Sequence, residues 1–159
     1  MKVIVCVDNE YGVMFNNRRQ SRDGEVINDI VHNIKDRLWI SEFSKEMFVE
    51  YFNKYSVEYI ELENVFKVSS SFDDKCRDIE IIVDNDMLDK VNEDEWCFVE
   101  NVLLERYKDS INKVILYNWN KKYPADRYLD INMNEYSLIE SNEFKGFSHD
   151  IIIKSSYVK

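Results

Sequence analysis

Apolar and polar positions along the chain predict a regular alternation of strands and helices. An apolar run at residues 3–7 predicts a buried strand, and a turn at Asp8 and Asn9 follows it. Over residues 24–36, apolar side chains recur every three or four positions, which predicts a helix with one apolar face. Asp23 precedes this helix as a plausible N-cap, because its carboxylate can accept bonds from free backbone N–H groups.

The later part of the chain continues this alternation. Short apolar or alternating runs predict strands at 38–40, 57–62, 79–83, 95–99 and 113–119. Helical spacing predicts helices at 45–55 and 102–110, with a helical turn at 87–91. Ser41 or Ser44 is expected to cap the first of these helices, and Asn101 the second. Loops are expected at Ser69–Ser71 with the following Asp73 and Asp74, and from Pro124 to Asp130.

Residues 136–158 predict two long antiparallel strands joined around Lys145 and Gly146. The whole pattern predicts an α/β fold, with a mixed, mostly parallel sheet flanked by helices and closed by this C-terminal antiparallel hairpin. A chain of 159 residues fits a single domain over 1–159. Ligands of such sheets bind beyond the carboxyl ends of the strands, which here lie near residues 7–12, 40–44, 99–101 and 117–119.

The net charge of −10 limits the partners that the protein is expected to bind. A field of this sign repels phosphate backbones and anionic membranes, so neither nucleic acid nor a membrane is expected. The three cysteines, Cys6, Cys76 and Cys97, show no CxxC spacing, which argues against a disulfide framework or a zinc site. The apolar run after Lys2 is too short for a signal peptide, so we expect a cytoplasmic protein.

Arg18, Arg19 and Arg22 form the densest positive patch in this acidic chain. Arginine forks hold carboxylate or phosphate groups with two parallel hydrogen bonds, so these residues are the best candidates for binding a small anion. The alternative is a solvated loop whose arginines pair with nearby acids such as Asp23.

The order and spacing of the predicted elements resemble dihydrofolate reductase over nearly the whole chain. The segment VIVCVDNEYGV is similar to that family's first strand and the glycine that begins its mobile loop. LWISEFSKEMF and EWCFVENVLLERYKDSINKVILYNW are similar to its two cofactor-binding turns with their flanking strands and helices. YPADRYLDI and EYSLIESNEFKGFSHDIIIKSSYV are similar to its ending, including a Ser-His pair at Ser148 and His149. The resemblance implies a cleft near Gly12, Ser44 and Asn101.

Both cofactor turns depart from the family pattern. The family's consecutive glycines let backbone N–H groups approach the dinucleotide phosphates, but this chain has Val99-Glu100-Asn101-Val102 there. The family's Gly-Arg-hydroxyl turn is replaced by Ser41-Glu42-Phe43-Ser44. Glu42 and Glu100 bring negative charge to both phosphate positions, so no cofactor is predicted. NADPH is expected only under the alternative that the protein is a divergent reductase.

The residues that match the family's catalytic groups are also altered. Glu25 is the nearest match to its proton-donating acid, Asp29 lies one turn later, and Tyr117 replaces the threonine that supports the acid. Glu25 is equally explained as an acid at a helix N-terminus. We therefore predict a non-catalytic module that binds a small anion, a nucleotide or a protein. The alternatives are a divergent NAD(P)H-dependent reductase for a pterin-like substrate and an acidic inhibitor or immunity protein with a basic partner.

The chain also resembles short bacterial proteins labelled ribonuclease Z. That enzyme needs a His-x-His-x-Asp-His cluster to bind two zinc ions. This sequence has only His32 and His149, so the label is rejected and no metal site is predicted.

Overall fold

The computed structural model describes residues 1–72 and 75–159, without the side chains of residues 70–77. The main sheet is built from β1 (Lys2–Val7), β4 (Arg37–Ile40), β5 (Tyr59–Leu62), β6 (Val65–Phe72), β7 (Lys75–Val83), β8 (Trp96–Phe98), β9 (Lys113–Asn118), β11 (Ser137–Phe144) and β12 (Ile152–Val158). Their order across the sheet is β11-β12-β9-β1-β8-β4-β7-β6-β5.

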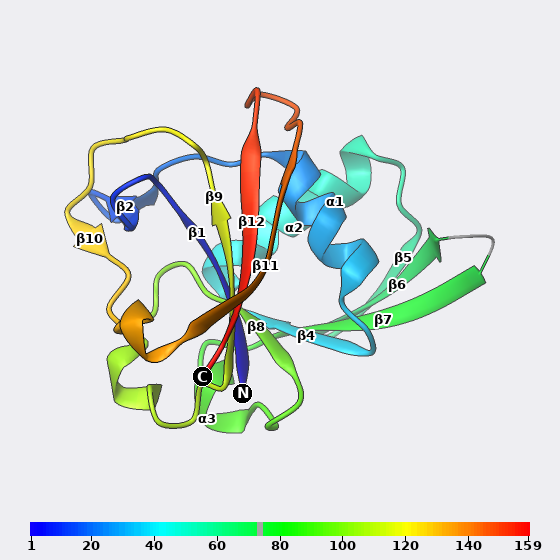
Figure 1. Ribbon diagram of the computed structural model, residues 1–159. Helices are drawn as coiled ribbons and strands as arrows, with labels where there is room; N and C mark the ends of the chain where they lie inside the picture. Colours follow the sequence, from blue (N-terminus) through cyan, green and yellow to red (C-terminus); the bar gives the residue numbers. More distant parts are fainter. Residues whose placement is uncertain (73–74) are drawn as a thin grey trace.

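The centre of this sheet is parallel and both of its edges are antiparallel. Strands β9, β1, β8, β4 and β7 run parallel, whereas β11 with β12, and β5 with β6, form the antiparallel edges (Figure 1). This arrangement confirms the predicted α/β class and the C-terminal hairpin. A second, three-stranded sheet is formed by β2 (Gly12–Phe15), β3 (Arg18–Arg19) and β10 (Arg127–Tyr128).

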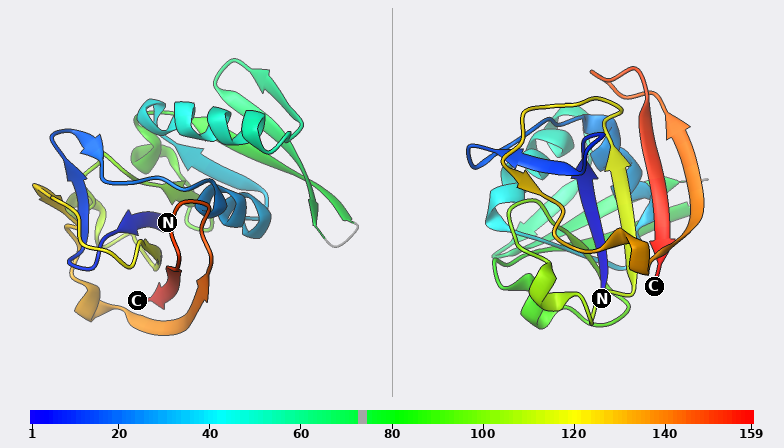
Figure 2. Two further views of the ribbon diagram at one scale, coloured as in Figure 1. Left: turned by 90° about the horizontal axis from the view of Figure 1, so that it is seen from above. Right: turned by 60° about the vertical axis from the view of Figure 1, so that its left-hand side comes forward.

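Helices α1 (Gly24–Asn33) and α2 (Glu42–Lys54) cover one face of the main sheet, side by side (Figure 2). The short helix α3 (Met87–Lys90) contributes to the core on the other face. Asp23 is the N-cap of α1, as predicted, and accepts a bond from the N–H of Glu25. Helix α2 begins earlier than predicted, with Ser41 at the N-cap position. Within the part of the chain described, no helix is long and apolar enough to cross a lipid bilayer.

The predicted helix at 102–110 is wrong. This segment holds only a single 3₁₀ turn, η1 (Glu105–Tyr107). The carboxylate of Asp130 accepts bonds from the N–H groups of Leu104 and Glu105, which anchors the start of this turn to a distant loop. Leu104 is buried but Leu103 is 55% exposed, so the segment lacks the continuous apolar face that stabilises a longer helix.

Two predicted loops contain strands. Ser69–Ser71 belongs to β6, whose backbone pairs with β7, while Asp73 and Asp74 lie outside the described residues. The loop from Pro124 to Asp130 contains β10, which pairs with β2. Neither stretch has a strand pattern of its own, so each depends on its pairing partner. For Ser69–Ser71 the partner is β7, which follows β6 closely in the chain, and for β10 it is the distant β2.

Packing between the two helices and the sheet predicts that two phenylalanines contribute differently to the free energy of unfolding. Phe48 is fully buried, with its ring centroid 5.5 Å from that of Phe98, whereas Phe15 is 41% exposed. Phe48→Ala should lower the free energy of unfolding by about 3–5 kcal/mol. Phe15→Ala should change it by less than about 1 kcal/mol. Urea denaturation measures both, and equal effects would contradict this packing.

Candidate functional site

The three arginines of the predicted anion site do not act as one patch. Arg19 points inward and is paired with Glu100, while Arg22 pairs with Glu50 at the surface. Arg18 is exposed and makes no ion pair with the described residues. The structure therefore separates one half-buried arginine, paired with a buried carboxylate, from two that are more exposed to solvent.

Arg19 and Glu100 form a two-pronged ion pair. Nε of Arg19 donates to Oε1 of Glu100 at 2.8 Å, and Nη2 donates to Oε2 at 3.0 Å. Ser44 donates its hydroxyl to the same carboxylate at 2.6 Å, and Nη2 of Arg19 also donates to the carbonyl of Phe43. Burial acts to lower the pKa of Arg19, but the bonds with Glu100 outweigh this and raise it. The guanidinium of Arg19 is thus charged and already hydrogen-bonded to Glu100 and to the carbonyl of Phe43.

The residues expected to border the cleft are packed together. Ser44 is taken by Glu100, and Asn101 accepts a bond from the hydroxyl of Ser41 at 3.4 Å. Gly12 has no room to spare, because a Cβ there would lie 2.6 Å from Nε2 of Gln20. This end of the sheet is therefore filled by side chains where the resemblance implied a cleft.

Carboxylates stand at both positions that the resemblance assigns to cofactor-binding turns. Glu100, at the position of the family's glycine turn, is only 8% exposed. The hollow that Glu100 lines has a volume of only about 10 Å³. The following segment, where a helix was predicted, holds only the turn at Glu105–Tyr107. Glu42 lies exposed at the start of α2 and adds a further negative charge there.

The two candidate proton donors both lie on α1. Glu25 accepts a bond from the hydroxyl of Tyr55 at 3.0 Å. Asp29 accepts from the hydroxyl of Tyr117 and from Nζ of Lys154, each at 2.6 Å. Burial, with Asp29 as the second cause, raises the pKa of Tyr117. A catalytic role for either acid stays a prediction, although Asp29 has the strand partner that the resemblance implied.

A cluster around His149 escaped the sequence analysis. Nδ1 of His149 lies 2.9 Å from Asp23, and Nε2 lies 3.0 Å from the hydroxyl of Ser21 and 3.1 Å from that of Tyr123. The imidazole stacks on Trp119 with ring centroids 4.7 Å apart. The sequence marked Asp23 as an N-cap and His149 as part of a Ser-His pair, but no local pattern joined them, because they lie 126 positions apart.

Asp23 joins this cluster to α1 and to the C-terminal hairpin. Besides capping α1, its carboxylate accepts bonds from the backbone N–H groups of Phe147 and Ser148. Burial acts to raise the pKa of Asp23, but the bonds from His149 and from these N–H groups lower it to about 2. Asp23 is therefore ionised throughout the physiological range.

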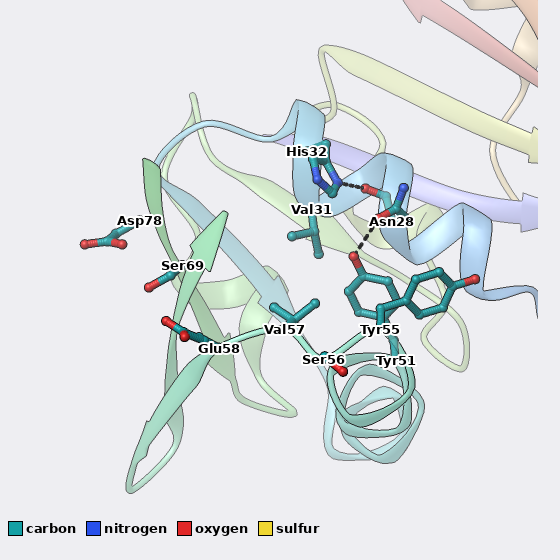
Figure 3. Close-up of a pocket in the computed structure, with 10 residues that line it drawn as sticks. All are labelled: Asn28, Val31, His32, Tyr51, Tyr55, Ser56, Val57, Glu58, Ser69 and Asp78. Atoms are coloured by element: carbon teal, nitrogen blue, oxygen red, sulfur yellow. Dashed lines mark hydrogen bonds between the residues drawn. The ribbon is translucent and has the colours of Figure 1, made fainter. Parts of the chain in front are cut away.

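Two hollows lie along the groove between α1 and α2. The smaller, of about 290 Å³, is bordered by Ile27, Met47, Tyr51, Tyr55 and Phe147, with Arg22, Glu50 and Lys54 among its charged residues. The larger, of about 600 Å³, lies toward β6 and β7 and includes Asn28, His32, Glu58 and Asp78 (Figure 3). Tyr51 and Tyr55 border both hollows, and Tyr51 donates its hydroxyl to Asn28 at 2.8 Å. The groove is thus divided by a pair of tyrosines.

The described side chains favour neither metal binding nor thiol chemistry. Among the described residues, no three His, Cys, Asp or Glu side chains gather as metal ligands would. Cys6 and Cys97 are free thiols, and burial raises the pKa of both, to about 12 for Cys97. Such thiols are poor nucleophiles near neutral pH.

The two arginine–glutamate pairs predict different losses of stability. Glu100→Gln leaves Arg19 without its charged partner in a place with little water, which should cost about 2 kcal/mol of unfolding free energy. Glu50→Gln is the matched control. It breaks a pair whose side chains are 56% and 49% exposed, so its effect should stay below about 1 kcal/mol. Chemical denaturation measures both, and a larger loss for Glu50→Gln would contradict this assignment.

The lowered pKa of Asp23 predicts a pH-dependent contribution to stability. Its folded-state pKa of about 2 lies below the usual value of 3.8, so the contribution is present above about pH 4. It is then lost as the pH falls through about 2. Asp23→Asn should cost on the order of 2 kcal/mol at pH 6, and progressively less below pH 4. Urea denaturation of both proteins from pH 6 to pH 3 measures this, and a constant difference would contradict it.

Comparison with known proteins identifies the fold. No protein-family model matches the sequence, and no curated protein matches it. Among solved structures, dihydrofolate reductase from Enterococcus faecalis, complexed with NADP(H) and RAB-propyl, is similar with a TM-score of 0.57 and 8% sequence identity. The match covers 99% of this chain and 94% of the reductase chain. The chain therefore has a dihydrofolate reductase-like fold.

Proposed function

We propose that this protein is a reductase-fold binding module whose ligand is a small aromatic anion held in the groove between α1 and α2. One observation carries the proposal: Arg19 is locked by a buried carboxylate, whereas Arg22 beside this groove is held only by the exposed Glu50. An exposed ion pair contributes about 0–1 kcal/mol, so a ligand carboxylate can replace Glu50 at little cost.

The groove supplies the other contacts that such a ligand needs. Ile27, Met47 and the aromatic rings of Tyr51, Tyr55 and Phe147 border the hollow of about 290 Å³, which suits one substituted ring. Lys54 places its Nζ 3.4 Å from the centroid of the Phe147 ring and adds a second positive charge. Aromatic walls with two cations favour a flat anion such as a benzoate over a neutral or flexible molecule.

A second candidate is the divergent NAD(P)H-dependent reductase with a pterin-like substrate. The bond between Asp29 and Tyr117 favours it, because it links an acid on α1 to the strand position that supports the proton donor in the resembling family. The packed pair of Arg19 and Glu100 counts against it, since NADPH would need another route of binding. A nucleotide or a protein ligand for the exposed arginines is a weaker form of the first proposal.

Calorimetric titration with 4-aminobenzoate, its methyl ester and cyclohexanecarboxylate tests the binding proposal. We expect saturable binding of 4-aminobenzoate, at least about tenfold tighter than that of the ester, which lacks the charge. Arg22→Gln should weaken binding about tenfold, and Glu50→Gln should strengthen it by removing the competing carboxylate. Arg18→Gln is the matched control and should leave the affinity unchanged.

Three outcomes of the same titration contradict the proposal. They are no binding of 4-aminobenzoate, equal binding of its ester, and a weakening caused by Arg18→Gln alone. Saturable binding of NADPH, followed by oxidation of its nicotinamide with a pterin, would favour the reductase instead.

A further inference from the structure

The imidazole of His149 joins a buried acid to two hydroxyl groups. The side chains of His149 and Asp23 are 3% and 0% exposed, with 2.9 Å between Nδ1 and the carboxylate. On the opposite edge of the ring, Nε2 lies 3.0 Å from the hydroxyl of Ser21 and 3.1 Å from that of Tyr123. Ser21, His149 and Asp23 thus have the spacing of a serine nucleophile, its base and the acid that orients the base.

Hydrogen bonds around Asp23 determine which nitrogen of His149 carries the hydrogen. Asp23 also accepts bonds from the N–H groups of Phe147 and Ser148, which keep it ionised and fix its position. An ionised Asp23 favours the tautomer of His149 that carries its hydrogen on Nδ1. Nε2 then offers one lone pair to two hydroxyl groups. When Ser21 donates to Nε2, the proton of Tyr123 is free to bind another acceptor.

We propose that Ser21 is the nucleophile of an acyl-transfer site that hydrolyses carboxylic esters. Oγ of Ser21 attacks the ester carbonyl carbon while its proton passes to Nε2 of His149, and the hydroxyl of Tyr123 donates a bond to the carbonyl oxygen as it becomes negative. The C–O bond to the alcohol breaks, and the alcohol leaves with the proton from His149. Water then attacks the acyl-serine by the same route, which releases the acid and restores Ser21.

A neighbouring hollow indicates the class of ester. It has a volume of about 440 Å³ and is lined by Phe15, Arg18, Gln20 and Tyr123, among others. The hollow is thus bordered by Gln20, the residue before Ser21, by Tyr123, and by the exposed Arg18. Because Arg18 makes no ion pair with the described residues, an ester whose acyl group ends in a carboxylate fits best.

Mono-4-nitrophenyl succinate and 4-nitrophenyl acetate test this activity, because released nitrophenol is read directly. We expect turnover of the succinate ester and labelling of Ser21 by a fluorophosphonate, located by peptide mass spectrometry. Ser21→Ala should lower kcat by at least about 100-fold and abolish the label. Ser141→Ala, which changes an exposed serine on β11, is the matched control and should keep both. Circular dichroism shows whether each variant is folded.

Two further variants separate catalysis from a structural role. Tyr123→Phe should lower kcat about 100-fold with little change in KM, as expected when a donor to the oxyanion is removed. Arg18→Gln should raise KM about tenfold for the succinate ester but not for the acetate.

Three results would overturn the proposal. They are a folded protein that releases nitrophenol no faster than buffer, equal rates for the parent and Ser21→Ala, and a phosphonate found on any other residue. Asp23 also borders the α1–α2 groove, but the ester is placed in the hollow beside Arg18 and the reaction uses no NADPH. Nitrophenol release and benzoate titration are separate measurements, so failure of one proposal is distinguishable from failure of the other.

Discussion

Glu100 carries a negative charge into a place just beyond β8 that water barely reaches, and much of the surrounding structure follows from that charge. A buried carboxylate is costly unless donors satisfy it, and here Arg19 and Ser44 supply them. Arg19 comes from β3 of the small sheet and Ser44 from α2. One carboxylate therefore ties the small sheet, the main sheet and α2 together at the edge where ligands of such folds bind.

The same ion pair is the basis of our proposal for what this protein binds. In a glycine-rich turn, backbone N–H groups are left for phosphate oxygens, whereas Glu100 puts an acceptor in that place. Here the carboxylate of Glu100 accepts bonds from Arg19 and Ser44 instead. The cations that remain near solvent are Arg22 and Lys54 beside the α1–α2 groove and Arg18 at the separate hollow, and these are the ones to which we assign binding in our proposals.

Asp23 plays a comparable part beside the α1–α2 groove. Its carboxylate accepts bonds from the first turn of α1, from the tip of the C-terminal hairpin and from His149. These bonds hold the imidazole against Trp119 and aim its second nitrogen at Ser21 and Tyr123. Asp23, which the sequence marked as a helix cap, thus also positions the His149 ring nitrogen that contacts two hydroxyl groups.

The sequence alone determined the elements whose signals are local. Apolar alternation located β1, β4, β8 and β9, helical spacing located α1 and α2, and Asp23 marked the start of α1. Their order was enough to predict the α/β class and the C-terminal hairpin, because alternating strands and helices leave few ways to pack a sheet. Arg18, Arg19 and Arg22 were also recognisable as a cluster in the sequence.

Only the tertiary structure decided what those arginines do. Arg19 and Glu100 are 81 positions apart, and Asp23 and His149 are 126 apart, so no local pattern connects them. The same limit explains the error at 102–110, where Asp130 binds the backbone from 26 residues away and a single turn forms in place of a helix. Periodicity and capping are read within a few residues, whereas ion pairs between buried groups depend on which distant segments folding brings together.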